Sequence, residues 1–194
     1  MEYDGDMSLR HGLLGLLTDQ PGSGWDLLKR FESSLAFVWP ATQSQLYTEL
    51  NRMAADGLVE ASATGARNRK EYAITQDGRD ELRRWITDVV PERNRRNDAL
   101  LRVFFLWTVD RDAARAYLER EASAYKSFHD LLEQVKDSTH WDDSEFDRFG
   151  RIALENGLRS LAASEDWARW ALGQLEPPRA QPRRRKATAS RSPG

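Results

Sequence analysis

The sequence predicts a mainly α-helical fold with one small β-hairpin, divided between two domains. Two observations support this prediction. Residues 42–78 contain, in order, an amphipathic helix, a strand, a short basic segment, a second strand and the start of another helix. Residues 98–176 show helical patterning almost throughout. The first pattern is typical of a winged helix-turn-helix domain, and the second of a small helical domain.

The helix expected after Pro40 begins with a T-x-x-Q capping box, formed by Thr42 and Gln45. Its buried face is predicted from apolar residues at helical spacing, which are Leu46, Leu50 and Met53. The opposite face carries short polar groups, a phenol and an amide: Ser44, Tyr47, Thr48 and Asn51, with Arg52 at its edge. Such side chains can hydrogen-bond to base edges and phosphates in DNA. The alternative is an ordinary amphipathic helix with a polar outer face.

A β-hairpin is expected directly after this helix. Asp56-Gly57 ends the helix, because glycine can adopt the left-handed conformation of a helix cap. The return strand turns Tyr72 and Ile74 inward. The basic run between the strands is interpreted as a wing that contacts DNA phosphates through Arg67, Arg69 and Lys70. A solvated basic turn is the alternative.

The next helix is expected to be capped by Thr75 and to carry an apolar stripe of Leu82, Trp85, Ile86 and Val89. Three further helices are expected at about 98–107, 111–137 and 142–174. The last of them places seven residues inward or at an interface: Phe146, Phe149, Ile152, Leu158, Leu161, Trp167 and Ala171. Three helices alone make a thin core, so a second copy of the chain is expected to cover the remaining apolar surface in a two-fold dimer.

The composition of the chain divides it into five expected segments. Residues 1–6 form a flexible leader, 7–90 the winged domain, 91–97 a hinge and 98–176 the helical dimerisation domain. Residues 177–194 are rich in Pro, Arg and Ser and are expected to be a disordered basic tail.

Several motifs of the first half resemble those of the PadR family of bacterial transcriptional regulators. They are the runs LRHGLLGLL at 9–17, GWDLLKRF at 24–31, FVWPATQSQLY at 37–47, ELNRM at 49–53 with DGLV at 56–59, and KEYAITQDG at 70–78. The second half resembles the longer members of the family, whose C-terminal part is a helical dimerisation domain like that of virulence-type activators. The supporting motif there is DALLRVFFLW at 98–107. Another winged-helix family such as MarR is the alternative, and the long helical C-terminal half favours PadR.

The resemblance implies a homodimeric transcriptional regulator, expected to be a repressor, that binds a pseudo-palindromic double-stranded operator and is released by a small-molecule effector. In the family, aromatic-lined cavities hold small hydrophobic or phenolic molecules. Four tryptophans enrich the second half of this chain, namely Trp107, Trp141, Trp167 and Trp170, and we interpret them first as core and interface anchors. A protein-interaction module that uses a winged-helix scaffold without an operator is the alternative function.

Other functions find little support in the sequence. The chain has no cysteine, which excludes disulfides and thiol chemistry, and no glycine-rich phosphate loop or catalytic signature. We therefore expect no enzymatic activity, no cofactor and no metal. The group His140, Asp142, Asp143 and Glu145 is interpreted as the start of a helix. No apolar run is long enough to span a bilayer, so no membrane partner and a cytoplasmic location are expected.

The charge distribution is unusual for a DNA-binding protein. Residues 1–90 hold 10 Lys and Arg against 14 Asp and Glu, and residues 91–176 hold 13 against 17. Residues 177–194 hold 6 basic and no acidic residues, which brings the net charge of the chain to −2. Positive charge is therefore concentrated in the expected wing and tail, and the acidic remainder is the strongest argument against DNA binding.

Overall fold

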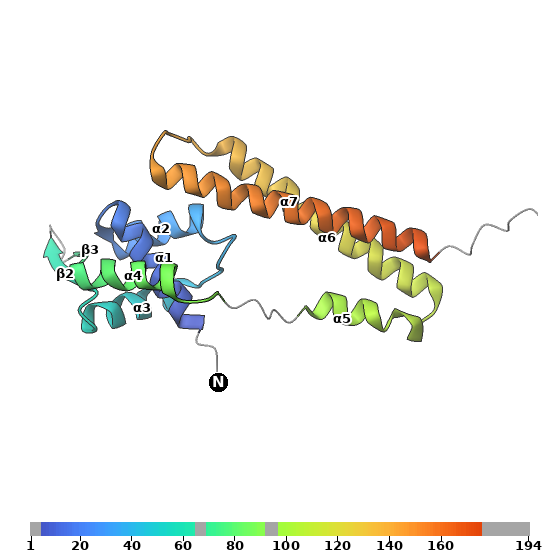
Figure 1. The fold of residues 1–194 in the computed structure, drawn as a ribbon, viewed down its shortest axis with the longest axis horizontal. Coiled ribbons are helices and arrows are strands. Elements are labelled where there is room, and N and C mark those ends of the chain that lie inside the picture. The colour runs from blue at the N-terminus through green and yellow to red at the C-terminus, as the bar shows by residue number, and fades with distance from the viewer. Residues whose placement is uncertain (1–4, 65–68, 92–96, 176–194) are drawn as a thin grey trace, which may run out of the picture. The chain divides into compact units, whose positions relative to one another are not determined.

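The computed structural model describes residues 5–64, 69–91 and 97–175, which form two compact units. One unit lies within residues 1–95 and the other within residues 96–194 (Figure 1). The change of unit falls inside the segment that the sequence assigns to a hinge. The five segment boundaries derived from the composition remain predictions.

The first unit is built from four helices around a leucine-rich core. The helices are α1 (Gly5–Asp19), α2 (Gly24–Ser34), α3 (Gln43–Ala55) and α4 (Gln76–Asp88). Side chains that are almost completely buried come from α1, α2 and α3 together, among them Leu13, Leu27, Phe31, Leu50 and Met53. Helix α3 is therefore held from its apolar side by α1 and α2, as the spacing of its leucines predicts.

A three-stranded antiparallel sheet completes the first unit. Its strands are β1 (Gly22–Ser23), β2 (Val59–Thr64) and β3 (Arg69–Ile74), in the order β1-β3-β2. The expected hairpin is confirmed as β2 and β3, with Val59 opposite Ile74 and Ser62 opposite Glu71. Strand β1 was not expected from the sequence, and it pairs Gly22 with Tyr72 and Ser23 with Glu71. Two residues carry no strand periodicity, so only their pairing with β3 defines them.

Local hydrogen bonds explain where α3 and α4 begin and end. The Thr42 hydroxyl accepts from the backbone N–H of Gln45, and the Gln45 side chain accepts from the N–H of Thr42, so the predicted capping box is confirmed. Helix α3 ends before Gly57, whose φ of 73° is left-handed. The Thr75 hydroxyl caps α4 by accepting from the N–H of Gly78, also as predicted.

The apolar stripe expected on α4 is only partly covered within the chain. Leu82 packs against the core of the first unit, and the Trp85 ring stacks on His11. Ile86 is 64% exposed and Val89 is 39% exposed, so the far half of the stripe faces solvent in the single chain.

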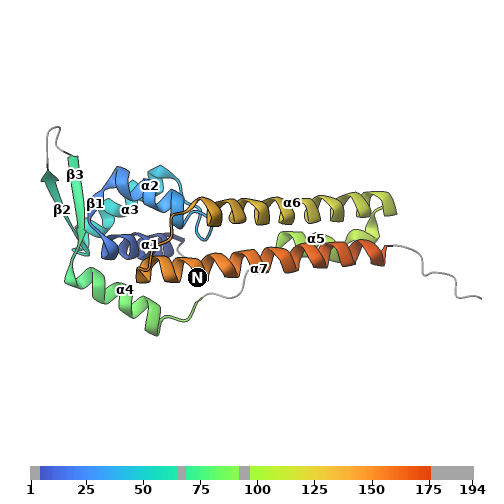
Figure 2. The ribbon, with the colours of Figure 1, turned by 90° about the horizontal axis from the view of Figure 1, so that it is seen from above.

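The second unit is a long helical hairpin with a short helix packed beside it. It consists of α5 (Asp98–Phe104), a 3-10 turn η1 (Leu106–Thr108), α6 (Arg111–Ser138) and α7 (Glu145–Gln174). Figure 2 shows α6 and α7 running side by side, with α5 next to them. The Tyr117 hydroxyl of α6 donates to the Ala99 carbonyl of α5 at 3.2 Å and links the two helices. The buried residues of this unit are alanines and leucines, namely Ala114, Leu118, Ala122, Leu132, Leu158, Ala168 and Ala171.

The start of α7 differs from the expected residue 142. The Ser144 hydroxyl accepts from the N–H of Asp147, which makes Ser144 the N-cap and Glu145 the first helical residue. The Asp142 carboxylate accepts from the N–H of Ser144, and the Asp147 carboxylate accepts from the N–H of Asp142. Hydrogen bonds from the hydroxyl and the backbone N–H of Ser144 lower the pKa of the Asp142 carboxyl. The acidic group therefore opens a helix, as interpreted from the sequence.

Candidate nucleic-acid interface

Helix α3 presents the polar face that the sequence assigns to DNA. Ser44, Thr48, Asn51 and Arg52 are exposed, and Tyr47 is half-buried. Leu46, Leu50 and Met53, on the opposite side, are at most 1% exposed. The predicted separation of faces is therefore present, and five side chains that can donate or accept hydrogen bonds lie along one accessible strip of helix. Their contact with DNA remains a prediction.

Tyr47 is positioned by the N-terminus of α2. A Cβ atom built on Gly24 would lie 2.4 Å from the Tyr47 ring, so only glycine leaves room for the ring at this point. The ring thus rests on the first turn of α2, a turn that Ser23 and Asp26 hold by a reciprocal capping box. This packing fixes the direction of a phenol on the outer face of α3.

A buried carboxylate, which the sequence analysis did not single out, holds α3 against α1. Glu49 is 2% exposed, and its Oε1 accepts from Arg10 Nε at 2.7 Å. Arg10 also pairs with Asp56 at 2.9 Å, just past the end of α3. Burial opposes the charge of Arg10, but the two carboxylates outweigh it and raise its pKa. Arg10 is therefore bound to both ends of the last two turns of the helix.

The same carboxylate orients one of the predicted contact residues. Arg52 Nη1 lies 3.5 Å from Glu49 Oε2, which makes an ion pair but not a hydrogen bond. The side chain of Arg52 is 52% exposed, so its guanidinium reaches solvent while the ion pair with Glu49 restricts its position. No pattern in the sequence indicates this arrangement, because Arg10 and Glu49 lie 39 residues apart.

The wing differs in one respect from the expected basic loop. Arg69 and Lys70 belong to β3 and not to the turn, where they pair with Thr64 and Ala63. The Lys70 side chain is exposed. Arg67 and the side chain of Arg69 lie outside the described residues. Lys70 is thus the one predicted wing cation whose side chain is described, and it lies on the strand that also carries Tyr72.

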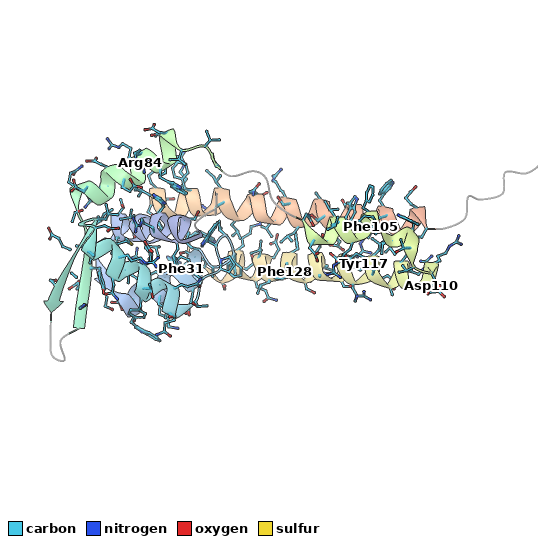
Figure 3. The ribbon with its side chains drawn as sticks, turned by 90° about the horizontal axis from the view of Figure 1, so that it is seen from below. Phe31, Arg84, Phe105, Asp110, Tyr117 and Phe128 are labelled. Atoms are coloured by element: carbon cyan, nitrogen blue, oxygen red, sulfur yellow. The ribbon has the colours of Figure 1, made fainter. Side chains whose placement is uncertain are left out.

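A second clamp, again missed in the sequence, fastens α4 to α1. His11 is 1% exposed, its ring stacks on Trp85 with 4.5 Å between ring centroids, and its Nε2 lies 3.0 Å from Glu81 Oε1. Burial raises the pKa of Glu81, but hydrogen bonds from Arg84 and His11 outweigh it and lower the pKa overall. Figure 3 marks Arg84 on α4.

The arrangement of the first unit defines a class of protein. Helices α1 to α3, the hairpin of β2 and β3 and the following α4 form a winged helix-turn-helix, in which α3 occupies the position that a recognition helix has in this fold. The partner of such a domain is double-stranded DNA, and its second unit is a helical domain without a sheet in the described residues.

The comparisons with known proteins agree with this class. Residues 13–84 match the transcriptional regulator PadR-like family, and residues 95–176 match the virulence activator alpha C-terminal family. The probable transcriptional regulator Rv1176c of Mycobacterium tuberculosis is 31% identical over 178 residues, which cover 83% of this chain and 94% of that protein. The negative transcriptional regulator PadR of Bacillus subtilis is 30% identical over 111 residues, covering 55% of this chain and 60% of that protein.

Solved structures extend the similarity to the whole fold. The crystal structure of Bacillus subtilis PadR with operator DNA has a TM-score of 0.77 at 22% identity and covers 87% of this chain and 99% of that one. PadR has also been solved with p-coumaric acid, with a TM-score of 0.76 at 21% identity over 90% of this chain and 98% of that one. The chain belongs to the PadR-like family of DNA-binding transcriptional regulators.

Family membership also bears on the excluded functions, since the PadR-like proteins are regulators and not enzymes. Within residues 5–64, 69–91 and 97–175, no three His, Asp or Glu side chains come together in a group that could bind a metal ion. In the same part of the chain, no helix has both the length and the apolar character needed to cross a bilayer.

Proposed function

We propose that the protein is a homodimeric repressor of the cytoplasm that binds a pseudo-palindromic operator and leaves it when a small molecule binds. The exposed strip of α3 carries this proposal. Ser44, Tyr47, Thr48, Asn51 and Arg52 contact the major groove, and Arg67, Arg69 and Lys70 contact phosphates beside it. The Bacillus subtilis relative with operator DNA supports the assignment of the ligand.

The dimer is supported by apolar side chains that the second unit leaves uncovered. On α5 and the 3-10 turn, Phe104 is 74% and Trp107 is 78% exposed. On α6 and α7, Phe128, Phe149 and Ile152 are each about 60% exposed. Phe105 and Phe128, labelled in Figure 3, belong to the same group. So many large apolar side chains on one small unit are typical of an interface between subunits.

A recess in the second unit is the proposed site of the effector. The second unit has a recess of about 280 Å³ lined by Asn97, Leu100, Tyr125, Ala163, Ser164 and Trp167. A recess of this size with two aromatic walls suits a small aromatic or hydrophobic molecule. That Bacillus subtilis PadR has been solved with p-coumaric acid supports an effector of this kind.

An electrophoretic shift against the DNA upstream of the protein's own gene tests the proposal. We expect the parent protein to bind this duplex more tightly than an unrelated one. Replacement of Asn51 by Ala removes a side chain that pairs with a base, so discrimination between the two duplexes should fall by about tenfold. Replacement of Lys70 by Ala removes a phosphate contact, so affinity for both duplexes should fall alike.

Two outcomes would contradict the proposal. If the parent protein bound all duplexes equally at low salt, it would have no specific operator. If it bound no duplex at all, the alternative function as a protein-interaction module would be favoured. Glu119→Ala, on the exposed surface of α6, is the matched control and should bind as the parent does.

A further inference from the structure

A recess in the first unit lies where four elements, β1, α2, α3 and β3, meet. It measures about 330 Å³ and is lined by Ser23, Gly24 and Trp25 of the β1–α2 junction, Tyr47 and Asn51 of α3, and Lys70 and Tyr72 of β3. Strand β1 brings these elements together, because its pairing with β3 sets Gly22 opposite Tyr72. Two of the lining residues, Tyr47 and Asn51, also belong to the exposed strip of α3.

Tyr72 gives this recess a donor that has no other use in the fold. The residue is 3% exposed, and none of the described residues forms a hydrogen bond with its hydroxyl. Because Tyr72 lines the recess and none of the described side chains bonds to its hydroxyl, this hydroxyl is available to a group that binds there. Burial, followed by the nearby Tyr47, raises the pKa of Tyr72. The phenol therefore keeps its proton at neutral pH and can donate it to an anion.

The first turn of α2 supplies further donors at the same point. The N–H of Asp26 donates to the Ser23 hydroxyl. The N–H groups of Gly24 and Trp25 lie in the first turn, where the helix provides no carbonyl four residues earlier to accept from them. These amides lie at the positive end of the helix dipole, which favours a negative charge. Helix α2 has 11 residues, enough for this dipole to develop.

The charges around the recess also favour an anion. Lys70 and Tyr72 alternate with Glu71 along β3, so Glu71 points to the opposite face of the strand. The Asp26 carboxylate accepts hydrogen bonds from the N–H and hydroxyl of Ser23 and is partly neutralised by them. The recess therefore combines one ammonium group with several neutral donors.

We propose that this recess binds one phosphodiester group of the DNA strand beside the groove that α3 enters. It does so mainly through neutral donors, namely the Tyr72 hydroxyl and the first-turn amides of α2. The inference rests on the proposed function, because α3 must lie in a groove for a phosphate to reach its flank. The proposal also accounts for a regulator whose first 90 residues are acidic. Neutral donors hold a phosphate without adding positive charge, so binding depends less on salt than it would with more lysines.

The test measures affinity as a function of KCl concentration by fluorescence anisotropy, with a labelled duplex from upstream of the gene and one of mixed sequence. Tyr72→Phe should weaken binding to both duplexes by about tenfold at every salt concentration, because it removes one hydrogen bond to a charged group. The slope of log K against log salt should not change, since no cation is lost. Lys70→Ala should instead reduce that slope by about one.

Matched controls separate the possible results. Tyr117→Phe removes a phenol hydroxyl that bonds to the Ala99 carbonyl within the second unit, and this variant should bind DNA as the parent does. Tyr72→Phe should melt at the parental temperature or slightly above, because its hydroxyl has no partner to lose. Parental affinity of a folded Tyr72→Phe variant would overturn the inference, and so would a reduced salt slope in that variant.

Two further outcomes show whether the recess binds free phosphate or DNA phosphate, and whether a negative result contradicts only the phosphate site or also the proposed function. Inorganic phosphate is added at matched ionic strength, and the melting temperatures of the parent and of Tyr72→Phe are compared. We expect no rise in the parent's melting temperature that is absent from Tyr72→Phe. Such a rise, combined with unchanged DNA affinity, would assign the recess to free phosphate and overturn the inference. If Asn51→Ala loses discrimination while Tyr72→Phe behaves as the parent, the proposed function stands and only the phosphate site fails.

Discussion

At the scale of single residues, three buried polar side chains of the first unit help to hold α2, α3 and α4 in place. Glu49 is paired with Arg10, His11 with Glu81, and Ser23 with Asp26. Each pair joins a residue of the core to one near the surface, so the surface elements have fixed positions. A recognition helix that must meet a groove in one orientation needs such fixed support.

The His11–Glu81 pair predicts a pH dependence of stability. The folded-state pKa of Glu81 is lowered, so its contribution is fully present above the pKa of the unfolded chain and is lost as the pH falls through the folded value. We expect Glu81→Gln to lower the free energy of unfolding by about 1 kcal/mol at pH 7. Urea unfolding at pH 7 and pH 3.5 measures the difference, which should shrink at the lower pH.

Asp88→Asn is the control for the Glu81 prediction, since Asp88 is an exposed residue on the same helix and no described residue pairs with it as an ion pair. A Glu81→Gln effect that is equally large at both pH values would show that the carboxylate charge is not its cause.

At the scale of elements, the sequence predicted the helix ends that depend on neighbouring residues. It did not predict the strand and the ion pair that depend on residues far away in the chain. The capping box at Thr42, the left-handed Gly57 and the Thr75 cap all depend on residues within three positions, and the sequence indicates each of them. Strand β1 depends on Tyr72 and Glu71, about 50 residues away, and has no local signal. The burial of Glu49 likewise depends on Arg10, which sequence spacing cannot reveal.

The polar strip of α3 was predictable because a helix has a fixed period, and Ser44, Thr48 and Asn51 follow it. The position of Lys70 on a strand was not, since a basic run after a glycine is equally compatible with a turn. The role of Tyr72 was also hidden, because its alternation with Ile74 indicates only that it points inward. Its hydroxyl becomes notable only once the recess beside α2 is seen.

Helix caps give a prediction at this scale. Thr42→Ala removes the acceptor for the Gln45 N–H at 3.3 Å and should destabilise the first turn of α3 by about 1 kcal/mol. Amide hydrogen exchange of peptides from this turn should then be roughly fivefold faster. Ser144→Ala removes the matching cap of α7 and should accelerate exchange only there. Faster exchange throughout the chain in either variant would contradict a local role for the cap.

At the scale of the whole molecule, the apolar surface of the second unit is the main feature that a single chain leaves unexplained. Phe149 is 61% exposed at the centre of a stripe with Phe146 and Ile152 on α7. If a second copy covers this stripe, Phe149→Glu places a charge in the interface and should convert the dimer to a monomer. Sedimentation velocity measures the change.

The dimer prediction extends to DNA binding. A monomer presents one recognition helix and contacts half of a two-fold operator, so Phe149→Glu should bind it at least a hundredfold more weakly. Arg148→Glu, next to it on the same helix and 65% exposed at its side chain, is the matched control for a charge change and should remain dimeric. Sedimentation of the parent protein as a monomer would contradict the predicted dimer.

Selection of bound duplexes from a random pool tests whether α3 determines which DNA sequence the protein binds. The purified protein should enrich a two-fold symmetric motif whose half-sites lie about one helical turn, or a multiple of it, apart. The Asn51→Ala variant should enrich the same motif with one base preference lost in each half-site. Enrichment of no motif by the parent protein, or of an identical motif by both proteins, would contradict the assignment of α3 as the helix that determines the DNA sequence.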